Sequence, residues 1–196
     1  MIIIYGLGNN EDKYLYTRHN AGRLVMEYIT NKTSLTLDKG ENWFFTKIKW
    51  NKTDVIFLHS SGYMNNSGSV LSKFIKYYKI DATDPGFRLL ILQDDSDQIS
   101  GNNKLALGGG HAGHNGIQDI YRNSLSCNIT LDKVWRLKIG IRPLENIGKS
   151  ETFVLQKFAE SELTNLEKLA NTLVNMKEDL ADLNFEKVQN IVNTKI

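Results

Sequence analysis

The stretch Ile2-Ile3-Ile4-Tyr5-Gly6-Leu7-Gly8-Asn9 decides the fold class of this chain. Its apolar, mostly β-branched residues at 2–5 predict a strand that is buried on both faces, as in a sheet covered by helices on each side. Two closely spaced glycines then predict a tight loop. Because loops that follow buried strands often carry functional side chains, Asn9 is a first candidate site residue.

Segments with helical and strand-like periodicity alternate along the rest of the chain. Apolar residues at helical spacing predict helices over 20–29, 70–78, 117–124 and 160–183. We expect strands at 43–50, 54–59, 88–93, 104–107 and 133–141, the first two joined by a turn at 51–53. This order predicts an α/β fold with a twisted mixed sheet flanked by helices. Without a repeat or linker, we expect one domain over 1–196 with a C-terminal helical segment at about 160–195.

The composition is that of an ordinary globular protein. The 196 residues are 41% hydrophobic and carry 24 Lys+Arg against 22 Asp+Glu, which excludes wholesale disorder. No apolar run approaches the roughly 18 residues that a bilayer span requires, so we expect no membrane insertion. The chain enters its first strand without a leader, and the single Cys127 fits a reducing compartment, so we expect a cytoplasmic protein. We do not expect Cys127 to be a nucleophile.

Two glycine-rich stretches invite nucleotide-binding interpretations that fail in detail. In the first, the sixth position of a G-x-G-x-x-G pattern is Glu11 rather than glycine, which argues against dinucleotide binding. In the second, residues 108–116, no Gly-Lys-Ser/Thr follows, which argues against a P-loop. A flexible loop is one interpretation of the second stretch, but the His and Asn side chains between its glycines favour a binding loop.

Several loops present imidazole, amide or carboxylate groups. A neutral imidazole that is hydrogen-bonded to a carboxylate can take a proton from water, and amides can donate to an oxyanion. His19 with Asp94 would suit a metal-free hydrolase, although His19 is equally an ordinary helix-start residue and the spacing does not join it to Asp94. Zinc binding by His111 and His114 with an acidic residue is an alternative, which we do not favour because no helix preorganises these histidines.

Five motifs in order resemble the bacterial-type peptidyl-tRNA hydrolases. They are Gly6-Leu-Gly-Asn9 with Tyr14 and Thr17-Arg-His-Asn-Ala-Gly22; Tyr63-Met-Asn-Asn-Ser-Gly68; Asp94; the stretch 108–116; and Arg136-Leu-Lys-Ile-Gly-Ile141. The likeness runs from residue 2 to about 158, where Phe153-Val-Leu-Gln-Lys-Phe158 is similar to the closing segment of the family. The resemblance implies hydrolysis of the ester between peptide and tRNA, which recycles tRNA from prematurely released chains during translation.

The resemblance also implies roles for individual residues. His19 would be the general base on water and Asp94 would hold its imidazole, while amide groups would position peptide, water and oxyanion. These amides belong to Asn9, Asn65 and Asn115. The substrate-binding residues would be Tyr14, Met64, His114, Lys104 and Lys138. No metal and no cofactor are implied, the partner is peptidyl-tRNA, and we expect a monomer.

Some positions depart from the family pattern. The Pro-Gly that follows the first Asn in the family is Asn10-Glu11 here, from which we expect a looser loop and a less secure orientation of Asn9. Of the two cations that clamp a tRNA phosphate, one position is Ala106 and the other is Lys138. Lys104 lies on the same face of its predicted strand as position 106 and is the candidate replacement.

Three alternatives stay open at this point. A noncatalytic RNA-binding relative would use the same fold without the chemistry, and another hydrolase would cleave a different aminoacyl ester. A mitochondrial-matrix enzyme would be of the same type in another compartment. The complete set of imidazole, carboxylate and amide groups favours the peptidyl-tRNA hydrolase.

Overall fold

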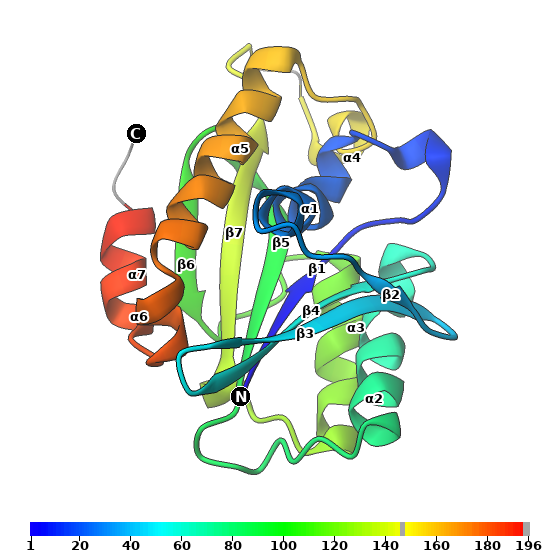
Figure 1. Ribbon diagram of the computed structural model, residues 1–196. Coiled ribbons are helices and arrows are strands. Elements are labelled where there is room, and N and C mark those ends of the chain that lie inside the picture. The colour runs from blue at the N-terminus through cyan, green and yellow to red at the C-terminus, as the bar shows by residue number, and fades with distance from the viewer. Residues whose placement is uncertain (146–147, 194–196) are drawn as a thin grey trace.

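A seven-stranded mixed sheet forms the centre of the molecule (Figure 1). The computed structural model describes residues 1–145 and 148–193. The strands are β1 (Ile2–Gly6), β2 (Asp38–Lys39), β3 (Trp43–Trp50), β4 (Thr53–Ser60), β5 (Arg88–Ile99), β6 (Asn103–Leu107) and β7 (Val134–Arg142), in the order β2-β3-β4-β1-β5-β7-β6. Strands β4, β1, β5 and β7 run parallel, whereas β2, β3 and β6 pair antiparallel with their neighbours. The expected α/β fold with a mixed sheet is confirmed.

Helices cover both faces of this sheet (Figure 1). One face packs against α1 (Ala21–Lys32), α5 (Glu160–Asn175), α6 (Lys177–Ala181) and α7 (Phe185–Val192), and the other against α2 (Ser67–Tyr77) and α3 (Asn115–Ser124). Strand β1 contributes to both hydrophobic clusters, Ile2 and Ile4 to the first, Ile3 and Tyr5 to the second. This alternation explains why residues 2–5 are apolar without interruption. A short helix, α4 (Ser150–Phe153), precedes α5.

Two predicted elements differ from the structure. The single helix predicted over 160–183 is two helices, because the chain bends at Met176 between α5 and α6, and it then turns at Leu183, where φ is +59°. Strand β5 continues to Ile99, beyond the predicted end at 93. Its polar second half stays paired with β7 through a register shift between Asp95 and Ile99. Residues 194 and 195 of the expected C-terminal segment lie outside the described residues.

Helix α7, which the sequence did not separate from the preceding helices, protects the edge of the sheet. The amide nitrogen of Leu105 in β6 donates to Asn193 Oδ1 at 2.6 Å, and its carbonyl oxygen accepts from Gln189 Nε2 at 2.8 Å. These bonds replace a missing strand partner and block edge-to-edge pairing. They also fix the backbone next to Lys104.

Among the described residues, no helix is both long and apolar enough to span a bilayer.

A close crossing of α1 over β5 sets the position of the residues that precede α1. A β-carbon built on Gly22 would lie 1.9 Å from the carbonyl oxygen of Leu92. Only glycine permits this approach, because the obstructing atom belongs to the backbone and cannot turn away. The crossing brings the start of α1, with His19, against the strand that carries Asp94.

Candidate active site

The side chains of His19, Asp94 and His114 meet at the carboxyl end of the parallel strands. Asp94 lies on β5, while His19 precedes α1 and His114 is the N-cap of α3. His19 Nδ1 is 3.0 Å from both carboxylate oxygens of Asp94, and His114 Nε2 is 2.9 Å from Asp94 Oδ1. Asp94 is 4% exposed, so its carboxylate is shielded from solvent. The pairing of His19 with Asp94, which spacing alone did not establish, is present in the structure.

The hydrogen bonds of His114 assign its ring proton. His114 Nδ1 accepts from the backbone N–H groups of Gly116, at 3.1 Å, and Ile117, at 3.4 Å. A nitrogen that accepts must carry its lone pair, so the ring proton lies on Nε2 and is donated to Asp94. His114 thereby caps α3 and holds the carboxylate in one orientation. A β-carbon on Gly116 would lie 2.8 Å from Met64 Sδ and 3.2 Å from the His114 ring, so a larger residue here would require these side chains to shift.

The electrostatics of the pair suit a base. Burial alone would raise the pKa of Asp94, but the two histidines outweigh it and hold this pKa well below its ordinary range. Burial alone would lower the pKa of His19, but the charge and hydrogen bond of Asp94 raise it above its ordinary value of 6.5. The ionised carboxylate accepts a hydrogen bond from the N–H of His19 Nδ1. The lone pair of Nε2 is then available to a water molecule.

A segment near the C-terminus holds the backbone around His19. The amide nitrogen of His19 donates to the Val154 carbonyl at 2.7 Å, and that of Arg18 donates to the Gln156 carbonyl at 2.9 Å. Arg18 is buried and makes a two-point ion pair with Glu162 of α5. Sequence reasoning missed these partners, although the family likeness of residues 153–158 was a signal that this segment serves the site.

Asn9 is buried and held on three sides. Its amide nitrogen donates to Asn20 Oδ1 at 2.8 Å, its carbonyl accepts from Asn20 Nδ2 at 2.9 Å, and its side-chain Oδ1 accepts from the Met64 N–H at 2.8 Å. Arg23 adds bonds to the Asn9 carbonyl and to Asn10 Oδ1. The looser loop expected from Asn10-Glu11 stays a prediction, and the side chains of Asn20 and Arg23 both hydrogen-bond to this loop. The added charge of Glu11 is paired with Lys13 at 2.7 Å.

A cavity of about 360 Å³ opens over the imidazole pair, and its lining includes His19, Asp94, His114, Asn115 and Lys138. Its wall also contains Val154, which was not among the predicted site residues. Other candidates lie outside this lining, including Asn9, which is buried. Met64 is buried beside Asn9, Asn65 is exposed in the following turn, Tyr14 is partly exposed in the loop before α1, and Lys104 is exposed on β6.

Comparisons with known proteins agree with this architecture. A family model described as peptidyl-tRNA hydrolase matches residues 3–196. The chain belongs to the peptidyl-tRNA hydrolase family. The peptidyl-tRNA hydrolase of Aliarcobacter butzleri is 34% identical over 189 residues, which cover 96% of this chain and 97% of the relative. That of Mesoplasma florum is 34% identical over 197 residues, which cover 98% of this chain and 100% of the relative.

A solved structure confirms the fold of this family member. The crystal structure of peptidyl-tRNA hydrolase from Acinetobacter baumannii matches with a TM-score of 0.82 and 30% identity, over 99% of this chain and 94% of that chain. The family resemblance drawn from the motifs, and the fold that it implied, are therefore confirmed.

The basic residues of this peptidyl-tRNA hydrolase family member form a pair across two strands. In the antiparallel register of β6 and β7, Lys104 stands directly opposite Lys138, and Ala106 stands opposite Arg136. Lys138 Nζ lies 3.6 Å from Asp95 Oδ2, whereas Lys104 has no ion pair among the described residues. Directly opposite residues on one sheet face have β-carbons about 5 Å apart. The register therefore places Lys104 and Lys138 on the same face of the sheet.

Among the described residues, His19, Asp94 and His114 are also the one group of three side chains with metal-ligating geometry. Ligand atoms of His19, Asp94 and His114 all lie within 4.8 Å of one another. His111, which the zinc alternative required, is not in this group, and its Nδ1 accepts from the Gly113 N–H of its own loop. His114 Nε2 fits a metal poorly, because the N-cap bonds to Nδ1 keep the ring proton on Nε2. The described structure therefore does not bring together His111, His114 and an acidic residue, the ligands that the zinc alternative requires.

Proposed function

We propose that this chain hydrolyses the ester bond between the peptide and the ribose of tRNA in peptidyl-tRNA, with His19 as the general base. The observation that carries the proposal is the His19–Asp94 pair at the floor of an open cavity, in a chain that belongs to the peptidyl-tRNA hydrolase family. An ester needs an activated water and a stabilised oxyanion, and this site supplies groups for both without a cofactor.

His19 Nε2 takes a proton from a water molecule, while the Asp94 carboxylate keeps its hydrogen bond with the N–H of His19 Nδ1. The water oxygen bonds to the ester carbonyl carbon, and the imidazolium that forms is stabilised by the Asp94 carboxylate. The imidazolium then returns its proton to the ribose oxygen as the carbon–oxygen ester bond breaks. The products are a peptide with a free carboxylate and a tRNA with a free terminal hydroxyl group.

Amide groups would orient the substrate and the oxyanion. The side-chain oxygen of Asn9 accepts from the Met64 N–H, so Nδ2 is the side-chain atom that would donate to the substrate. Asn115 is the first residue of α3 and lines the cavity, where a helix N-terminus also favours developing negative charge. We assign Asn65, Met64 and Tyr14 to the peptide side of the cleft, as the family motifs imply.

Lys104 and Lys138 would bind a tRNA phosphate together. Their opposed positions on β6 and β7 support this role, and the exposed Lys104 replaces the cation that is absent at Ala106.

We further propose that the enzyme acts as a monomer in the cytoplasm, where peptidyl-tRNA arises. Light scattering of the purified chain tests the monomer.

A release assay tests the function. N-acetylated and free forms of the same aminoacyl-tRNA are incubated with the purified chain, and the released amino acid is counted. We expect rapid release from the N-blocked substrate and much slower release from the free form. A chain that binds both tRNAs and releases neither would instead be a noncatalytic RNA-binding relative. Equal release would indicate a less selective aminoacyl esterase.

A further inference from the structure

Arg23 of α1 reaches back to the loop that follows β1. Its Nη1 donates to the Asn9 carbonyl oxygen at 3.0 Å and to Asn10 Oδ1 at 2.9 Å. Its Nε donates to Glu27 Oε1, one turn further along α1, at 2.7 Å. The Arg23 side chain is 15% exposed, so these bonds lie largely out of water. One guanidinium thus joins the helix to two successive residues of the loop.

The hydrogen bond from Arg23 to Asn10 requires a side-chain acceptor at position 10. The family pattern has Pro-Gly where this chain has Asn10-Glu11. A proline would stiffen the loop through its ring but would offer no side-chain acceptor. Asn10 lacks that ring and supplies an amide oxygen instead. A bond from a guanidinium to this oxygen is charge-assisted and directional, so it can restrain the loop in another way.

We propose that Arg23 is a positioning residue that holds Asn9 in its substrate-binding orientation, in place of the proline of the family pattern. Arg23 and Asn20 both donate to the Asn9 carbonyl oxygen, Arg23 also holds Asn10, and the Met64 N–H donates to the Asn9 side-chain oxygen. With the residue held at both ends, Nδ2 keeps one direction. The inference rests on the proposed role of Asn9 in substrate binding.

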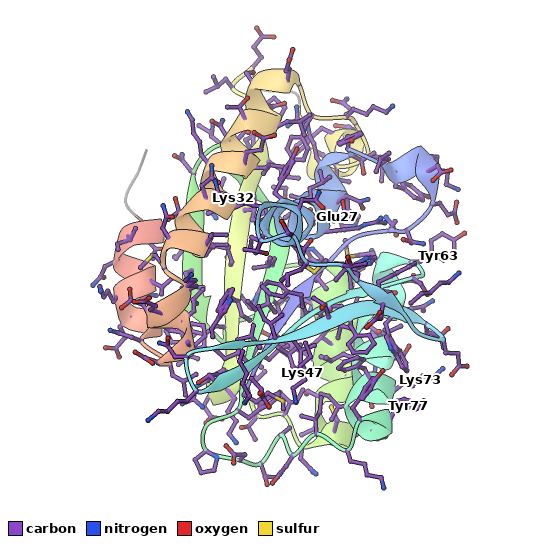
Figure 2. The ribbon with its side chains drawn as sticks, in the orientation of Figure 1. Glu27, Lys32, Lys47, Tyr63, Lys73 and Tyr77 are labelled. Atoms are coloured by element: carbon purple, nitrogen blue, oxygen red, sulfur yellow. The ribbon has the colours of Figure 1, made fainter. Side chains whose placement is uncertain are left out.

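The pairing with Glu27 offers a matched control. Glu27 lies on α1, away from the loop contacts, and Figure 2 labels it there. If Arg23 only stabilised α1 through this i,i+4 ion pair, Glu27→Gln would have the same effect as removing Arg23. If Arg23 acts on the loop, Glu27→Gln leaves both loop bonds in place. The two substitutions therefore separate a helix-stabilising role from a positioning role.

A double-mutant cycle tests the proposal. The parent, Arg23→Met, Asn9→Ala and the double variant are compared for kcat and KM on N-acetylaminoacyl-tRNA. Because displacement of a substrate-orienting group by about 1 Å can cost up to 100-fold, we expect Arg23→Met to lower kcat/KM by roughly 10- to 100-fold. In the Asn9→Ala background we expect less than about a 2-fold further loss, since the group that Arg23 positions is gone.

Further variants guard against a trivial loss of fold. We expect Arg23→Lys, which keeps a cation able to donate to both loop oxygens, to retain more activity than Arg23→Met. Asn10→Ala removes one of the two acceptors of Arg23, and we expect a smaller loss that is not additive with Arg23→Met. Glu27→Gln should stay within about 2-fold of the parent. Thermal unfolding of each variant shows that it is folded at the assay temperature.

Three results would overturn the inference. The first is an equal loss on Arg23→Met with and without Asn9, and the second is an equal loss in Glu27→Gln and Arg23→Met. The third is full activity of Asn9→Ala, which would leave nothing for Arg23 to position. None of these results removes the proposed function, which fails only if the parent does not release the N-blocked amino acid.

Discussion

Lys104 and Lys138 stand directly opposite each other on β6 and β7, and only Lys138 has a carboxylate, that of Asp95, within ion-pair distance among the described side chains. Two like charges on neighbouring strands repel each other unless an anion lies between them. A phosphate bound between them would remove this repulsion, which is the physical basis of the proposed clamp.

The first prediction concerns the salt dependence of tRNA binding. Each phosphate contact contributes a slope of about −0.7 to −0.9 in log K against log salt, so Lys104→Ala and Lys138→Ala should each weaken binding and flatten the slope by up to about one unit. Because Asp95 partly neutralises the charge of Lys138, we expect Lys104→Ala to change the salt slope more than Lys138→Ala does. Fluorescence titrations at several salt concentrations measure both slopes.

A lysine elsewhere on the surface serves as the control for this experiment. Lys73 is exposed on α2 (Figure 2) and does not line the cavity that contains Lys138, so Lys73→Ala should leave the slope unchanged. Ala106→Lys should gain little, since Lys104 already supplies the second cation. Identical slopes for the parent and both Lys→Ala variants would contradict the clamp.

The second prediction concerns the crossing of α1 over β5. Alanine usually stabilises a helix relative to glycine by about 1 kcal/mol. At position 22, however, the new β-carbon would meet the Leu92 carbonyl oxygen, so we expect Gly22→Ala to destabilise the fold by roughly 2–3 kcal/mol. Urea unfolding measures the change. Gly110→Ala, in open space, is the control, and equal midpoints for Gly22→Ala and the parent would contradict the prediction.

The third prediction concerns pH. The active form of His19 is neutral, so activity rises as pH passes its pKa, which Asp94 holds above 6.5. In Asp94→Asn the charge that raises this pKa is lost while burial remains, so the rise moves to lower pH. The maximal rate should also fall about 10²-fold or more, because the imidazole loses its orienting and stabilising partner.

The pH–rate profile of kcat/KM gives both quantities for this variant. Asp97→Asn, at the rim of the cavity, removes a carboxylate without touching His19 and should keep the inflection of the parent. If Asp94→Asn retained both the height and the inflection, Asp94 would not be the partner of His19 in catalysis.

The fourth prediction is that chelators leave turnover unchanged. The proton on His114 Nε2 points at Asp94, and His19 Nε2 is kept for water, so the proposed reaction uses no metal. We expect the same kcat/KM on N-acetylaminoacyl-tRNA before and after dialysis against EDTA. Loss of activity that added zinc restores would make His19, Asp94 and His114 ligands instead.

Local patterns predicted most of the fold. Uninterrupted apolar residues at 2–5 predicted a strand buried on both faces, and β1 is that strand. The apolar stripe through Leu166, Leu173 and Leu180 predicted a buried helical surface, and these residues are buried. The same stripe did not indicate the bend at Met176, because short helices that pack on one surface share one periodicity.

The site depended on contacts that no local pattern encodes. His19 and Asp94 are 75 positions apart, and they meet because α1 crosses β5 at a glycine. The sequence did not predict the hydrogen bonds from Arg23 to the loop, because no local pattern encodes them either. Sequence comparison with the family pattern shows that a proline is absent, but only the structure shows that a side chain from the next helix takes over its restraint.

The central claim is that His19 activates water on a peptidyl-tRNA ester, and single-turnover hydrolysis of N-acetylaminoacyl-tRNA by His19→Ala tests it most directly. We expect the rate to fall by roughly 10²- to 10⁴-fold while tRNA affinity, measured on the same preparation, stays near that of the parent. His111→Ala, also at the cavity, should keep its rate within a few-fold. A His19→Ala variant that turns over at the parental rate would contradict the claim.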